Sequence, residues 1–174
     1  MLNHDEVIQH VSRKFVQRMD TIIAVLFDEV QAKRRELSAA GTLLSGGGLI
    51  VITRLCIEAY DEAVKGIIEE LDWATKQVLY LPDGYSHRLA QLGVDQLTRI
   101  AFASNGHLEK TLAMAQPSAM ARGSMEMQLQ TKREASEEAI RLFMNQRRIE
   151  IPRNWLRGAL SVLLGLIKKW FGMN

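Results

Sequence analysis

Residues 49–80 read LIVITRLCIEAYDEAVKGIIEELDWATKQVLY, and this stretch decides between a strand-containing fold and an all-helical one. Its first four residues are apolar, and alone they would fit a buried strand. Apolar residues then recur every three or four positions from Leu55 through Ile67 to Val78, which is the spacing of one face of an α-helix. Strands are usually no longer than about 10 residues. The length of the pattern therefore predicts one long helix.

Prolines and one glycine-rich loop divide the rest of the chain into segments of similar length. Pro82, Pro117 and Pro152 lie at equal intervals of 35 residues, and residues 45–48 (SGGG) precede the first of them. Helices tend to end beside proline, because proline lacks a backbone donor and clashes with the preceding turn. We therefore predict four helical segments with a tail after Pro152, and we expect residues 105–106 (NG) to bend or split the third segment.

The other segments carry apolar stripes at helical spacing, although the fourth stripe is weaker because Lys132 and Ser136 interrupt it. Short connections between long helices place neighbours antiparallel. The sequence thus predicts an all-α fold: an antiparallel bundle of about four long helices in residues 1–150, plus a C-terminal amphipathic helix in residues 151–174. The stripes of the first, third and fourth segments are Ile8, Val11, Phe15, Met19, Ile22, Leu26 and Val30; Leu89, Leu97, Ile100, Leu108 and Leu112; and Met125, Leu129, Ile140 and Phe143.

Composition narrows the class of protein. The chain has 174 residues, of which 47% are apolar and 24% charged, so it can bury a core without a disulfide or a metal. A single cysteine, Cys56, excludes a disulfide framework and a multi-cysteine metal site. The first residues lack the layout of a signal peptide, so we expect a cytoplasmic protein of bacterial type. The four histidines show no metal-ligand spacing, and we expect neither a metal nor a cofactor.

One acidic helix face offers an enzymatic alternative. Glu58, Asp61, Glu62, Glu69 and Asp72 fall at helical offsets, and hard cations such as Mg²⁺ prefer oxygen ligands. All-α, magnesium-dependent nucleotide pyrophosphohydrolases use such faces. A second acidic cluster on another helix is missing, and Lys65 and Lys76 alternate with the acids. We therefore expect a solvated helix face and a protein that is not an enzyme.

A second alternative is a scaffold bundle that binds a protein partner through its fourth helix. Met114, Met120, Met125 and Met127 lie within 14 residues around the start of that helix, and methionine is common on adaptable helix-binding surfaces as well as in cores. The glycines at 46–48 lack the strand and the lysine of a nucleotide-binding loop, so we interpret them as an interhelical turn. Acidic residues are mixed among the arginines of the fourth helix, which speaks against nucleic-acid binding.

The tail is the most informative segment. It holds Arg153, Arg157, Lys168 and Lys169 but no acid. On a helix, one narrow stripe beside a broad apolar face would be formed by Asn154, Arg157, Ser161, Gly165 and Lys168. From Trp155 the apolar stretch covers about 25 Å, which is short of the roughly 30 Å of a bilayer core. A tryptophan near each end and a basic stripe are typical of a helix that lies in a membrane interface. The same face is also suited to closing the bundle core or an oligomer interface.

We therefore predict a non-enzymatic helical protein that self-associates as a homo-oligomer and uses its C-terminal helix for assembly or for association with an anionic membrane surface. Its expected location is the cytoplasm, peripheral at the inner face of the membrane. The predicted membrane or interface residues are Trp155, Leu156, Leu160, Leu163, Leu164, Ile167, Lys168, Lys169, Trp170 and Phe171.

Overall fold

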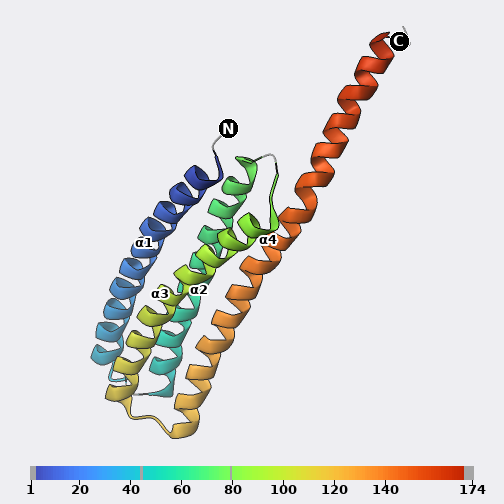
Figure 1. The fold of residues 1–174 in the computed structure, drawn as a ribbon. Coiled ribbons are helices and arrows are strands. Elements are labelled where there is room, and N and C mark those ends of the chain that lie inside the picture. Colours follow the sequence, from blue (N-terminus) through green and yellow to red (C-terminus); the bar gives the residue numbers. More distant parts are fainter. Residues whose placement is uncertain (1–2, 44, 79, 171–174) are drawn as a thin grey trace.

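The computed structural model describes residues 3–43, 45–78 and 80–170, with side chains up to residue 150. These residues form four helices and no strand, which confirms the predicted all-α fold class. The helices are α1 (His4–Ala39), α2 (Gly46–Lys76), α3 (Asp83–Ala115) and α4 (Ala119–Trp170) (Figure 1). Residues 49–52, which alone would fit a strand, lie within α2.

The helices form an antiparallel bundle with α2 and α3 at its centre (Figure 1). Short loops join consecutive helices, so each helix reverses the direction of the one before it. Both α2 and α3 contact all the other helices, whereas α1 and α4 make no contact with each other within the described part of the chain. The bundle is therefore flattened, with α1 and α4 on opposite sides of the central pair.

Local sequence explains where the first two helices begin. Asn3 and Glu6 form a reciprocal capping box at the start of α1, with both side-chain to backbone distances at 2.9 Å. The glycine-rich turn predicted at residues 45–48 is in part the first turn of α2, because Ser45 caps it by accepting a hydrogen bond from the Gly48 amide at 3.2 Å. A Cβ atom on Gly48 would lie 2.7 Å from the carbonyl oxygen of Thr42. The close approach of the preceding loop to the start of α2 therefore requires glycine at this position.

Two predicted breaks are absent from the described helices. α3 continues through Asn105 and Gly106 because Leu108 and Leu112, about one and two turns later, are buried in the core. Their burial offsets the roughly 1 kcal/mol that a helical glycine costs. α4 continues through Pro152 as one helix of 52 residues. Pro152 cannot donate to the carbonyl of Arg148, but helix-forming residues on both sides maintain the helix. The tail is therefore not set off as a separate helix.

The core confirms the apolar stripes that the sequence predicted. Phe15 and Met19 of α1 and Leu97 of α3 are fully enclosed, and Ile140 of α4 is enclosed although its stripe is the weakest. Polar Ser136, which interrupts that stripe, is also buried and donates a hydrogen bond to the carbonyl of Lys132 at 2.7 Å. The hydrogen bond of the Ser136 hydroxyl is thus made within α4. The buried polar group therefore does not prevent α4 from packing against α2 and α3.

Two glycines of α3 give a matched test of this packing. A Cβ atom on Gly93 would lie 2.7 Å from Cγ2 of Ile67 and 3.3 Å from Cγ2 of Ile140, whereas one on Gly106 would meet no described atom within 4 Å. We expect Gly93→Ala to lower the free energy of unfolding by about 1–3 kcal/mol through overpacking. Gly106→Ala should raise it by about 0.5–1 kcal/mol through helix propensity. Urea unfolding measures both changes, and shifts of the same sign would contradict this packing.

Candidate functional site

The predicted membrane or interface residues from Trp155 to Trp170 belong to the C-terminal part of α4. This part of the helix extends beyond the ends of α1, α2 and α3 (Figure 1). The side chains of these residues lie outside the described part of the structure, as does all of Phe171. Their contacts stay a prediction, and so does the division of the chain at residue 150. Among the described residues, no helix contains an apolar stretch sufficient to cross a bilayer.

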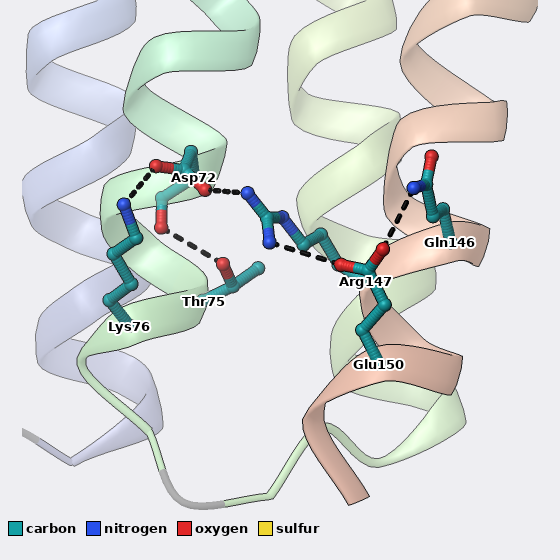
Figure 2. Close-up of polar contacts among 6 residues, drawn as sticks. All are labelled: Asp72, Thr75, Lys76, Gln146, Arg147 and Glu150. Carbon is teal, nitrogen blue, oxygen red and sulfur yellow. Dashed lines mark hydrogen bonds and ion pairs between the residues drawn. The ribbon is translucent and has the colours of Figure 1, made fainter. Parts of the chain in front are cut away.

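A group of polar residues ties α4 to α2 just before this extension (Figure 2). Asp72 of α2 forms an ion pair with Arg147 of α4 and accepts a second contact from Lys76 at 2.5 Å. Glu150 accepts from Arg147 at 3.1 Å and from Gln146 at 2.8 Å. The Arg147 guanidinium also lies 5.3 Å from the centre of the Phe143 ring. Arg147 is thus held by two carboxylates and an aromatic face.

These contacts join α4 to α2 but contribute little to the stability of the fold. Both Arg147 and Asp72 are part-exposed, and ion pairs of this kind contribute about 0–1 kcal/mol each. A second pair, between Arg148 and Asp83 at 3.1 Å, joins α4 to the start of α3. The last bundled turns of α4 therefore contact both central helices just before the extension.

The acidic face of α2 makes contacts between helices. Asp61 pairs with Lys132 of α4, and Glu69 pairs with Arg18 of α1 at 2.6 Å. The hydrogen bond from Arg18 lowers the pKa of the Glu69 carboxyl. Oε2 of Glu62 lies 4.0 Å from Nζ of Lys65 on the same helix. Glu58 lines a groove between α1 and α2. Within residues 3–43, 45–78 and 80–150, no three acidic, histidine or cysteine side chains are grouped as a metal site.

The methionines do not form one surface. Met125 is buried in the core, whereas Met120 and Met127 are exposed on α4 and Met114 is exposed on α3. The exposed methionines of α4 are therefore Met120 and Met127 within its described side chains, and docking of a protein partner there stays a prediction.

The four histidines are distributed along the bundle. The ring centroid of His4 lies 4.3 Å from that of Tyr85, and the ring centroid of His10 lies 4.5 Å from that of Trp73. His87 is exposed, and His107 is buried near Phe27. They therefore lie in four different environments.

Sequence reasoning missed a buried arginine. Arg34 is only 8% exposed, and its guanidinium reaches from α1 to α3. Nε donates to Oγ1 of Thr111 at 3.1 Å, and Nη2 donates to the same oxygen at 2.7 Å and to the carbonyl of His107 at 2.6 Å. A signal was present, because Arg34 follows Val30 by four residues and so continues the apolar stripe of α1.

Neutral polar groups surround this arginine inside the bundle. Burial raises the pKa of the Cys56 thiol to about 11, and the thiol donates to the carbonyl of Ser104 at 3.8 Å. Burial, followed by the charges of Arg34 and Lys110, lowers the pKa of His107. Its Nδ1 atom and the Ser104 hydroxyl have no hydrogen-bond partner among the described residues. At neutral pH the Cys56 thiol is protonated and the His107 imidazole is neutral. Of these three buried side chains, Arg34 is therefore the charged one.

Comparison with known proteins gives no match for this chain, whether with protein families, with curated proteins or with solved structures.

Proposed function

We propose that this protein is a non-enzymatic helical protein that associates with anionic membrane surfaces through residues 151–174. The supporting observation is the extension of α4 past the ends of the other helices (Figure 1). A helix that leaves the bundle does not close the bundle core. The broad apolar face that the sequence places on this segment therefore needs another partner, and a lipid interface is one that also suits its charge.

Charge distribution favours an anionic surface as that partner. Residues 1–150 contain 18 of the 22 basic side chains and all 20 acidic ones, so the bundle is nearly neutral. The tail carries the remaining four cations without a single acid. Each lysine or arginine close to an anionic membrane contributes about 1 kcal/mol of binding free energy. An interface between copies of the chain would use the apolar face but would not need the basic stripe.

The membrane proposal predicts selective, salt-sensitive binding to vesicles. We expect the full-length protein to float with vesicles of phosphatidylcholine and phosphatidylserine but not with vesicles of phosphatidylcholine alone. Binding should weaken as salt rises, because the Debye length falls from about 10 Å at 0.1 M to about 3 Å at 1 M. Flotation followed by quantification of the bound protein measures both effects.

Self-association through the tail predicts a different result. Light scattering would then report an oligomer that dissociates in Trp155→Ala or Leu163→Ala, while anionic vesicles leave the protein in solution. That combination would contradict the membrane proposal and would assign the tail to assembly.

A further inference from the structure

An open groove of 860 Å³ lies between the C-terminal halves of α1 and α3, beside the buried Arg34. Three cations line it, namely Arg34, Arg35 and Lys110, and no acidic residue does so among the described lining residues. Leu43, Ala113 and Met114 provide apolar surface in the same groove. Its volume is in the range of small-molecule sites, which is about 300–1,000 Å³.

Arg34 is a buried charge that meets only neutral acceptors. All its hydrogen bonds within the described residues go to the Thr111 hydroxyl and to the carbonyl of His107. Buried charges in proteins are normally paired, because an unpaired one carries a large desolvation penalty. Burial accordingly lowers the pKa of Arg34. An anion would offset this penalty.

The geometry also leaves Arg34 ready to bind. Nε and Nη2 are fixed by α3, while Nη1 has no hydrogen bond to a described residue and is not among the fully enclosed polar atoms. A guanidinium held in one orientation loses little entropy when it binds a carboxylate or phosphate. Arg35 and Lys110 are exposed and take part in no ion pair with a described residue.

We propose that this groove binds a small amphiphilic anion. Its carboxylate or phosphate lies against Arg34, Arg35 and Lys110, and its apolar part lies against Leu43, Ala113 and Met114. The groove is built from the C-terminal ends of α1 and α3, whereas the tail extends from the C-terminal end of α4. The antiparallel order of the helices places those ends at opposite ends of the bundle (Figure 1). This site is therefore independent of the membrane proposal.

Calorimetric titration of the full-length protein with monomeric octyl phosphate tests the site. We expect saturable binding of octyl phosphate, much weaker binding of inorganic phosphate, and none of the neutral octyl glucoside. Arg35→Gln and Lys110→Gln should each weaken binding about tenfold, which corresponds to one charge-assisted hydrogen bond. Arg34→Met should abolish it.

Arg13→Gln is the matched control, because Arg13 is an exposed cation on the same helix, about 30 Å from Arg34 along the axis. It should bind octyl phosphate like the parent protein. Equal binding by Arg13→Gln and by the double variant Arg35→Gln/Lys110→Gln would overturn the proposal, and so would equal binding of octyl glucoside. The double variant changes only exposed side chains, so it decides the outcome even if Arg34→Met fails to fold.

Vesicle flotation of the same double variant distinguishes the source of the anion. Unchanged flotation with anionic vesicles, combined with lost octyl phosphate binding, supports a soluble ligand. Loss of both supports the same site with a lipid headgroup as its ligand. Retained octyl phosphate binding in the double variant overturns the site whatever the vesicles show.

Discussion

Phe15→Ala should lower the free energy of unfolding by about 3–5 kcal/mol. Phe15 is 0% exposed and lies in the core on the face of α1 that meets the central helices. Truncation removes the transfer free energy of the ring and leaves a cavity that three packed helices cannot fully close. Domains of this size are stable by about 5–15 kcal/mol, so the change removes a large share of the total. Urea unfolding followed by far-ultraviolet circular dichroism measures it.

Phe102→Ala is the matched control for this prediction. Phe102 is 84% exposed on α3, so the same truncation there removes almost no buried surface. Its free energy of unfolding should stay within about 0.5 kcal/mol of the parent value. Equal losses in the two variants would mean that the bundle does not enclose Phe15, and the helix arrangement described here would be wrong.

Lys168→Glu combined with Lys169→Glu should reduce partitioning onto anionic vesicles about a thousandfold. Each lysine near such a surface contributes about 1 kcal/mol, and each glutamate is repelled by a similar amount. The double reversal therefore costs about 4 kcal/mol, and every 1.4 kcal/mol is tenfold. Titration of the protein with vesicles of increasing phosphatidylserine content measures this loss of binding.

Arg13→Glu combined with Lys14→Glu makes the same change in net charge on two adjacent, exposed positions of α1. If the tail is the contact surface, this control should bind vesicles nearly as the parent does, because charges beyond about 10 Å are screened at 0.1 M salt. Equal losses in the two double variants would show that net charge, and not the tail, governs binding.

The apolar periodicity of the chain was sufficient to predict the helical class and most of the core. Burial of one face is the dominant favourable term, and its 3–4 residue spacing is visible in sequence. Breaker residues were informative in part: residues 45–48, Pro82 and Pro117 lie at the helix boundaries as predicted, whereas two other predicted breaks are absent. The break expected at Asn105 and Gly106 is absent because Leu108 and Leu112 are buried beyond it, and Pro152 lies inside α4. A local penalty of about 1–3 kcal/mol is smaller than what a continued helix gains.

Of the candidate sites, the tail could be recognised from the sequence, whereas the contacts of the α2 carboxylates could not. The charge and apolar pattern of residues 151–174 is a property of the sequence alone, since a helix places neighbouring residues on defined faces. The partners of the α2 carboxylates were not predictable, because Arg18, Lys132 and Arg147 come from distant parts of the chain.

The sequence by itself determined the helical class and the basic, amphipathic character of the tail, because both depend on spacing within one segment. Only the tertiary structure decided that Arg34 is buried beside a cationic groove, with no carboxylate partner among the described residues. Burial of a charge is a matter of which helices surround it, and α1 meets α3 across more than 70 residues of intervening chain. Residues that far apart in the chain are brought together by helix packing, and the spacing of residues within one segment cannot predict such a contact.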